Sequence, residues 1–421
     1  MTAAARFLEC AGRPPEQAGF YWTGGPVEVA ERTWFTSWFS GVTAFDTDDG
    51  LVLVDTGSAP AAPGIAATIR RCTSSPVHTA VFTHGHVDHA YGLPEFLLDG
   101  QDPPAVVGHP DLLARASRYE RTRDHNRALN HRQFGGIVPE SGDPLGGIDF
   151  VSPPILPDRL VAADARLEVG GVAFDVHHAR GETDDALWVH CPERGVLCPG
   201  DLFVWAVPNC GNPQKVQRYP ADWARALREM AALRPVSLCP GHGGPVVGDP
   251  DRIQEMLITT AEFLEAIVDA TIDALNDGSP PHVDIVHAVA LPSSDLPWLQ
   301  PTYDDAEFIV RNVIRHLGGW WTGRPSELKP ATRAQVAAEI AALAGGAPVL
   351  ARRAGALADA GELRLACHLA DLAVEADPAD PEVSGLAAAV YERRADAETS
   401  LMAVNLFRSA AAYARAGRPF C

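Results

Sequence analysis

The stretch THGHVDHAYG, residues 83–92, constrains this chain more than any other part of its sequence. It places four metal-binding side chains within six positions: His84, His86, Asp88 and His89. Imidazole and carboxylate groups are donors that zinc and other borderline divalent metals accept. Four such donors in so short a segment are seldom ordinary polar loop residues, so the pattern predicts a metal site.

An apolar and β-branched run, VHTAVF, directly precedes the motif and predicts a strand. Side chains two positions apart on a strand point the same way, so His84 and His86 can share one metal where the strand ends. The chain then turns, and Asp88 and His89 can face a second metal. The sequence therefore predicts two metal positions at the end of a strand.

The residues around the motif predict alternating strands and helices. Strands are expected at residues 43–45, 51–54, 77–82 and 105–108, and a helix is expected at residues 60–71. One or two polar helices follow residue 108. This order is typical of an α/β protein whose site lies at strand ends.

Further donors occur after a second expected hairpin, which covers residues 160–176 with its turn at Gly170 and Gly171. They are Glu182 in a G-E-T sequence, Asp201 in P-G-D and His242 in P-G-H. Glycine in these turns allows a close approach between backbone and ligand. Each of these residues alone is weak evidence for a site.

Length and charge limit the class of protein. At 421 residues the chain is long enough for two or three domains. Its formal charge of −20 argues against nucleic acid or an anionic membrane as the main partner, because both attract Lys and Arg. A small anionic molecule is compatible, since metal ions supply local positive charge.

The cysteines and the N-terminus bear on the compartment. The eight cysteines form no C-x-x-C pair and no regular framework, which is typical of a reducing environment. The first residues contain no apolar stretch of signal-peptide length, and no segment has the length needed to span a membrane. We therefore expect a cytoplasmic protein.

Residues 332–416 are rich in alanine, with apolar residues three and four positions apart and a break at Asp377-Pro378. This pattern predicts helical hairpins. They are too few for a free-standing solenoid, which usually needs about three or more repeats. The helices must therefore bury a face either on the rest of the chain or on a second subunit.

With H-x-H-x-D-H, G-E-T, P-G-D and P-G-H in this order, the chain resembles the metallo-β-lactamase superfamily over roughly residues 20–250. The resemblance implies an α/β fold of αββα type, in which two sheets pack face to face with helices outside and metals at one edge.

Two features are similar to the alkyl sulfatase branch of that superfamily. Glu182 stands where relatives usually have the histidine of a G-H-T turn, and residues 297–331 resemble the start of the alkyl sulfatase dimerisation domain. The resemblance implies a catalytic domain at 1–250, a connecting helix at 251–277 and an all-α, TPR-like dimerisation domain at 278–421. It also implies a homodimer.

The resemblance also implies the roles of the donors. His84, His86 and Glu182 would hold one Zn²⁺, Asp88, His89 and His242 would hold the other, and Asp201 would bridge them. Other divalent transition metals are possible. Asp88, Glu182 and Asp201 form the catalytic set around a metal-bound hydroxide, which two divalent cations make available at neutral pH.

A polar segment after the motif offers groups that could grip a sulfate. Tyr119, Asn126 and Arg132 in that segment, together with Tyr303, are the expected substrate contacts. Arginine is well shaped to bind sulfate or carboxylate oxygens in pairs.

The function implied is hydrolysis of a sulfate ester to an alcohol and sulfate. Three departures from the alkyl sulfatase pattern keep an alternative open: Asp201 replaces a second glutamate, the chain ends soon after the helical region, and no signal peptide is evident. The alternative is hydrolysis of a carboxylic ester, thioester or lactone. A non-catalytic scaffold acting through its helices is a third hypothesis.

Overall fold

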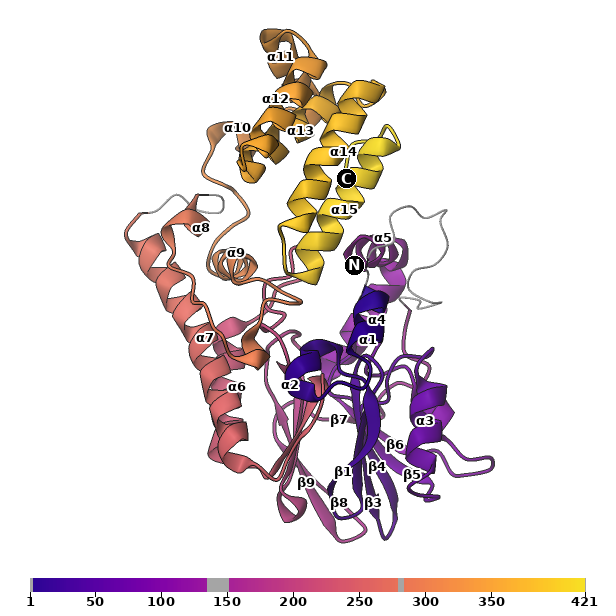
Figure 1. Ribbon diagram of the computed structural model, residues 1–421. Helices are drawn as coiled ribbons and strands as arrows, with labels where there is room; N and C mark the ends of the chain where they lie inside the picture. The colour runs from indigo at the N-terminus through magenta and orange to yellow at the C-terminus, as the bar shows by residue number, and fades with distance from the viewer. Residues whose placement is uncertain (1–2, 135–150, 279–283, 421) are drawn as a thin grey trace. The chain divides into compact units, whose positions relative to one another are not determined.

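The computed structural model describes residues 3–134, 151–278 and 284–420 (Figure 1). The chain forms two compact units. The first takes in residues 3–126 and 147–319, and the second residues 127–146 and 320–421, as far as these are described.

The larger sheet of the first unit has seven strands in sequence order. Neighbours from β1 to β4 pair antiparallel and those from β4 to β7 pair parallel. The strands are β1 Gly24–Ala30, β2 Thr33–Ser37, β3 Gly41–Thr47, β4 Gly50–Val54, β5 Val77–Val81, β6 Ala105–Gly108 and β7 Arg159–Leu160.

The smaller sheet has six strands in the order β13-β12-β11-β10-β9-β8. β11 and β12 pair parallel and the other neighbours antiparallel. The strands are β8 Ala165–Val169, β9 Val172–His178, β10 Leu187–Cys191, β11 Val196–Val204, β12 Ser237–His242 and β13 Val246–Val247.

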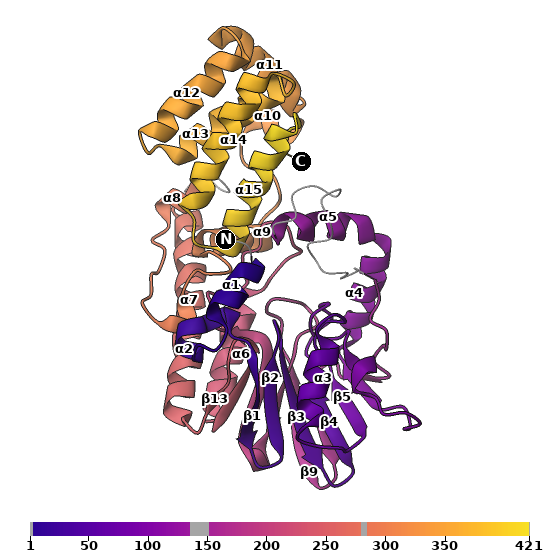
Figure 2. The ribbon, with the colours of Figure 1, turned by 45° about the vertical axis from the view of Figure 1, so that its right-hand side comes forward.

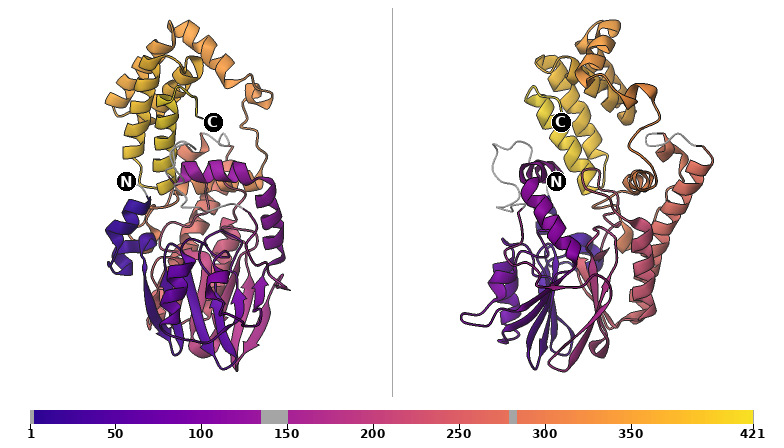
Figure 3. Two further views of the ribbon diagram at one scale, coloured as in Figure 1. Left: turned by 90° about the vertical axis from the view of Figure 1, so that its right-hand side faces the viewer. Right: turned by 180° about the vertical axis from the view of Figure 1, so that it is seen from behind.

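The two sheets pack face to face, with helices on both outer faces (Figure 3). Strand β4 illustrates the packing, because Val52 and Val54 belong to the core between the sheets and Leu51 and Leu53 to the core beneath α3. This is the alternation expected of a strand. Since both faces are covered, all of β4 is buried.

The helices complete an α-β-β-α arrangement, so the predicted sandwich is confirmed. Ile65 and Ile69 of α3 cover the larger sheet, while Trp223 of α6 and Ile253 of α7 cover the smaller one. The helices of this unit are α1 Ala3–Cys10, α2 Pro15–Ala18, α3 Ala62–Arg70, α4 Pro110–Arg121, α6 Pro220–Ala232, α7 Pro250–Asn276, α8 Ile285–Ala288 and α9 Ala306–Leu317.

The second unit is helical, as predicted (Figure 2). Its helices are α10 Pro325–Leu328, α11 Arg333–Ala344, α12 Ala347–Asp359, α13 Leu363–Ala376, α14 Pro381–Asp396 and α15 Leu401–Arg415, and it also takes in most of α5 Arg123–Gln133. Alanines such as Ala354, Ala370 and Ala387 are fully buried at its centre. Their small side chains let neighbouring helices pack closely. The turn between α13 and α14 lies at the predicted break.

The predicted hairpins at β3–β4 and β8–β9 are confirmed, and α3 matches the predicted helix within two residues. Strands β1 and β2 were not predicted, because the burial along β1 follows no simple alternation. The domain limits at residues 250 and 277 stay a prediction. Within the described part of the chain no single helix has both the length and the apolar character to cross a membrane, and α11 and α12 meet that test only as a pair bent by 85°.

We predict that Leu53→Ala lowers the free energy of unfolding by about 2–5 kcal/mol, because it leaves a cavity at a fully buried position of β4. The matched control is Leu233→Ala, which is 42% exposed and should change the stability by less than about 0.5 kcal/mol. Urea unfolding followed by circular dichroism measures both. Equal losses in the two variants would contradict this description of the core.

Candidate metal centre

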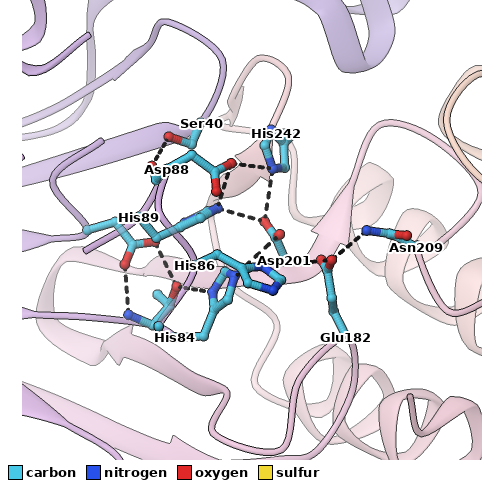
Figure 4. Close-up of polar contacts among 12 residues, drawn as sticks. Ser40, His84, His86, Asp88, His89, Glu182, Asp201, Asn209 and His242 are labelled. Carbon is cyan, nitrogen blue, oxygen red and sulfur yellow. Dashed lines mark hydrogen bonds and ion pairs between the residues drawn. The ribbon is translucent and has the colours of Figure 1, made fainter. Parts of the chain in front are cut away.

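The donors singled out in the sequence converge at one edge of the two sheets (Figure 4). The motif of residues 84–89 follows β5, Glu182 lies in the loop between β9 and β10, Asp201 lies within β11, and His242 ends β12. Because β11 and β12 run parallel, their carboxyl ends reach the same edge.

Two glycines allow β11 to approach the residues that begin the motif and β12 to approach β11. Gly200 has a φ of +55°, and a Cβ there would lie 2.6 Å from the side chain of Thr83. A Cβ at Gly241 would lie 2.2 Å from Oδ1 of Asp201. The P-G-D and P-G-H sequences therefore meet a steric requirement.

The first group of donors contains His84, His86, Glu182 and Asp201, whose ligand atoms all lie within 4.8 Å of one another. Nε2 of His84 lies 2.9 Å from Nδ1 of His86 and 3.6 Å from Oδ2 of Asp201. Nδ1 of His86 lies 3.8 Å from Oε1 of Glu182. Two imidazole nitrogens this close either share a proton or face a common cation.

The second group contains Asp88, His89 and His242, again within 4.8 Å. Nε2 of His89 and Nε2 of His242 lie 3.6 and 3.5 Å from the same oxygen of Asp88. Oδ1 of Asp201 lies 3.2 Å from His89 and 3.4 Å from His242. The two oxygens of Asp201 thus face different groups, and Figure 4 shows this side chain between them.

The electrostatics of the histidines differ between the groups. Burial, reinforced by His89, lowers the pKa of His84 to about 3, and burial next to His84 lowers the pKa of His86 well below its usual value. Burial opposes a charge on His89 too, but Asp201, Asp55 and Asp88 raise its pKa well above the usual value. Carboxylates therefore draw a positive charge to this position.

The residues fit a pair of divalent metal ions. Nε2 of His89 and Oδ1 of Asp201 are buried and lie 3.2 Å apart, yet among the described residues neither atom makes a hydrogen bond of good geometry. Buried polar atoms are rarely left in this way unless an ion or water satisfies them. Imidazole nitrogens and carboxylate oxygens are also the donors that zinc accepts.

His89 and His242 each make a further polar contact through Nδ1, the ring nitrogen that faces away from the other donors. Oδ2 of Asp55 lies 2.8 Å from Nδ1 of His89, and the two oxygens of Asp55 accept hydrogen bonds of 2.7 Å from N and Oγ1 of Thr83. Nδ1 of His242 lies 2.7 Å from the carbonyl oxygen of Phe39. Such contacts fix the rings so that the other nitrogen of each ring faces the second group of donors. Asp55 takes a φ of +59° to reach this place.

Glu182 has a different kind of support. Nη1 of Arg218 lies 2.6 Å from Oε1 of Glu182, and Asn209 donates its side-chain N–H to the same oxygen. All three side chains are buried. Burial raises the pKa of Glu182 to about 8 even though Arg218 opposes this shift. A bound cation would favour the ionised form.

The turn that carries the motif is anchored by Asp185. Its carboxylate accepts hydrogen bonds from N of Gly85 at 2.9 Å and from Nε of Arg115 at 3.1 Å. Burial opposes ionisation of Asp185, but Arg115 lowers its pKa to about 2. Through these contacts Asp185 and Arg115 keep the turn with His84 and His86 in place at the end of β5.

The four expected substrate contacts lie in different places. Tyr303 stacks on Phe20, which stacks on His242, with ring centres 4.5 and 4.6 Å apart. Tyr119 is buried on α4, while Asn126 donates a hydrogen bond of 2.7 Å to Thr122. Arg132 belongs to the second unit, where its guanidinium lies 5.5 Å from the ring centre of Phe420. Their roles toward a substrate stay predictions.

Sequence reasoning missed the residues that hold the ligands, namely Asp55, Asn209, Arg218 and Asp185. A signal existed for Asp55, because it directly follows a predicted strand in a unit that leads to the motif. Asn209 and Arg218 lie in a segment without periodicity, so the sequence alone offers no reason to pair them with Glu182.

Two family models match the chain. The metallo-beta-lactamase superfamily matches residues 38–242, and alkyl sulfatase dimerisation matches residues 282–417.

Similar proteins agree with both matches. A linear primary-alkylsulfatase of Pseudomonas sp. is 26% identical over 380 residues, which cover 83% of this chain and 69% of that protein. An (R)-specific secondary-alkylsulfatase of Pseudomonas sp. is 24% identical over 405 residues, which cover 90% of this chain and 60% of that protein.

A solved structure shares the fold. The stereoselective inverting sec-alkylsulfatase Pisa1 from Pseudomonas sp. matches with a TM-score of 0.83 at 21% identity, over 96% of this chain and 67% of that chain. With a metallo-β-lactamase domain followed by an alkyl sulfatase dimerisation domain, and with alkylsulfatases as relatives, the chain belongs to the alkyl sulfatase branch of the metallo-β-lactamase superfamily.

Proposed function

We propose that the chain is a dinuclear zinc hydrolase that cleaves a sulfate ester to an alcohol and sulfate. The observation that carries the proposal is the joint presence of seven donors, five of them buried, and an alkyl sulfatase dimerisation domain. The alkylsulfatases among the relatives support the same reaction.

The proposed ligands follow the two groups of donors. His84, His86 and Glu182 would hold one zinc, Asp88, His89 and His242 would hold the other, and Asp201 would be shared, since its two oxygens face the two groups. When bound, the metals supply the Lewis acidity that activates water and the ester. Asp55, Thr83 and Arg218 would orient the ligands.

The charge of the site suits an anionic ester. Three carboxylates among the ligands face two divalent ions, which leaves a net positive centre. Arg218 adds positive charge beside Glu182, and its Nε is buried without a hydrogen-bond partner among the described residues. Tyr119, Asn126, Arg132 and Tyr303 remain proposed contacts.

We further propose a homodimer in a reducing compartment such as the cytoplasm. The dimerisation family match includes residues 320–417 of the helical unit, and α11 exposes Leu343 at 88% and Val336 at 45%. Exposed apolar side chains on one helix suit a protein interface. The seven described cysteines are all free, which fits the proposed compartment.

We predict that the purified chain hydrolyses a medium-length alkyl sulfate faster than the carboxylic ester of equal length. Chelation should abolish the sulfate release, and two equivalents of zinc should restore it. Ion chromatography of released sulfate measures the rate, and oxygen-18 water shows whether the alcohol or the sulfate receives the label. Preference for the carboxylic ester, or activity that survives chelation, would contradict the proposal.

We predict that Asp55→Asn weakens zinc binding by about 10- to 100-fold, because the amide cannot accept every hydrogen bond that the carboxylate receives behind His89. Competition with a chromophoric chelator measures the affinity. Asp48→Asn is the control, since the side chain of Asp48 is 80% exposed. Equal affinities in both variants would show that Asp55 does not support the metal.

We predict that Leu343→Glu converts a dimer to a monomer, because it places a charge in the apolar surface of α11. Light scattering at micromolar concentration measures the mass. Leu233→Glu, a change at a 42% exposed position of the first unit, should leave the dimer intact. A monomeric wild-type chain would contradict the proposed assembly.

A further inference from the structure

Helix α9 lies within the residues matched by the dimerisation family, yet it packs in the first unit. Its Ile309, Val310 and Val313 are buried in the same core as α6 and α7. The polar side of this helix, together with the residues before it, faces the segment between β11 and α6. We call that segment, residues 205–219, the β11–α6 loop.

The carboxyl-terminal part of the β11–α6 loop is fixed by Asn312. Nδ2 of Asn312 donates a hydrogen bond of 2.8 Å to the carbonyl oxygen of Arg218, and Oδ1 of Asn312 accepts one of 3.1 Å from Gln217. Nearby, Arg315 donates a bond of 3.1 Å to the carbonyl oxygen of Lys215. Asn312 is 7% exposed, so little water can replace these bonds.

The amino-terminal part of the loop is fixed by Asp304. Its Oδ2 accepts a hydrogen bond of 2.6 Å from N of Gly211, and its side chain is fully buried. A Cβ at Gly211 would lie 2.4 Å from N of Ile309, so the loop runs directly against the start of α9. The backbone N–H of Val207 also donates to the carbonyl oxygen of Gln300, at 3.0 Å.

The loop residues that α9 and the residues before it hold, Val207, Gly211 and residues 215–218, lie on either side of Asn209 and include Arg218. Asn209 and Arg218 are the two residues that bond Glu182. Asn209 lies between Val207 and Gly211, and Arg218 is itself the residue whose carbonyl Asn312 holds. Arg218 and Asn209 both bond Oε1 of Glu182, and Arg218 also donates to the carbonyl oxygen of Asn209. The position of that oxygen therefore depends on where the loop is held.

We propose that Asp304 and Asn312 are positioning residues for the metal centre, which act on Glu182 through the β11–α6 loop. This inference rests on the proposed role of Glu182 as a metal ligand. It predicts a larger effect on the metal that Glu182 would hold than on the other, because His89 and His242 are held by Asp55 and Phe39 and meet this segment only through the stack of Tyr303 on Phe20. Groups bonded directly to a ligand typically change metal affinity by about 10- to 100-fold, so residues that act through such groups should change it by less.

The test uses Asp304→Asn and Asn312→Asp, which keep the size of each side chain but reverse one hydrogen-bonding role. On the full chain, chelator competition should show one zinc equivalent bound up to about 10-fold more weakly and the other changed less. Arg311→Ala, on the exposed side of the same helix, should have no effect. If the two buried variants do not fold, the exposed Arg315→Ala should show a smaller loss at the same zinc equivalent.

Two comparisons separate this inference from the proposed function. Glu182→Ala should weaken the same zinc equivalent, and adding Asn312→Asp to it should weaken that equivalent no further. If Glu182→Ala leaves both equivalents unchanged, the ligand assignment fails and this inference fails with it. Suppose that Glu182→Ala weakens the binding of one zinc equivalent, but that Asp304→Asn and Asn312→Asp weaken the binding of neither equivalent. This inference alone is then overturned. It is also overturned if the two variants weaken zinc binding no more than the destabilised Leu53→Ala does.

Discussion

The structure depends on keeping one carboxylate, that of Asp201, buried among imidazoles at the edge of the sandwich. The side chain is 7% exposed, and its two oxygens face His84 on one side and His89 with His242 on the other. An ionised carboxylate loses several kcal/mol of hydration in such a place unless positive charge compensates it. Burial opposes ionisation, yet His89 and His242 hold the pKa of Asp201 well below its usual value. The two sheets can therefore close at this edge only around cations, either protons on these histidines or metal ions.

Local sequence patterns predicted the parts of the site that are local in space. The motif of residues 84–89 lies on one turn after one strand, so its spacing alone indicates the chemistry. Asp201 and His242 became predictable through the resemblance, and the structure adds the steric reason for the glycines before them. Arg218 and Asn312 are 94 positions apart, and no periodicity links them. Arg132 lies in a polar helical segment, and polarity alone does not say which compact unit such a segment joins.

Helix α9 shows how a boundary in sequence can differ from a boundary in packing. The dimerisation family match begins at residue 282, but the apolar stripe of Ile309, Val310, Val313 and Ile314 is buried with α7 in the first unit. A helix with such a stripe must bury it on whatever surface is complementary. Here that surface belongs to the unit that contains the metal-binding donors. Residues that look like part of an assembly domain thus help to shape the site.

The carboxylate of Glu182 explains why the β11–α6 loop must be held by α9. A buried histidine can remain neutral, whereas an ionised glutamate must be paired with positive charge. Arg218 supplies that charge, but an arginine that is 2% exposed must itself be held by hydrogen bonds. The bond from Asn312 to its carbonyl oxygen fixes its backbone, and the bonds to Glu182 and Asn209 fix its guanidinium. A histidine at position 182 would leave Arg218 as a buried cation without its carboxylate. The glutamate ligand, the arginine and the helix that fixes the arginine therefore form one interdependent set.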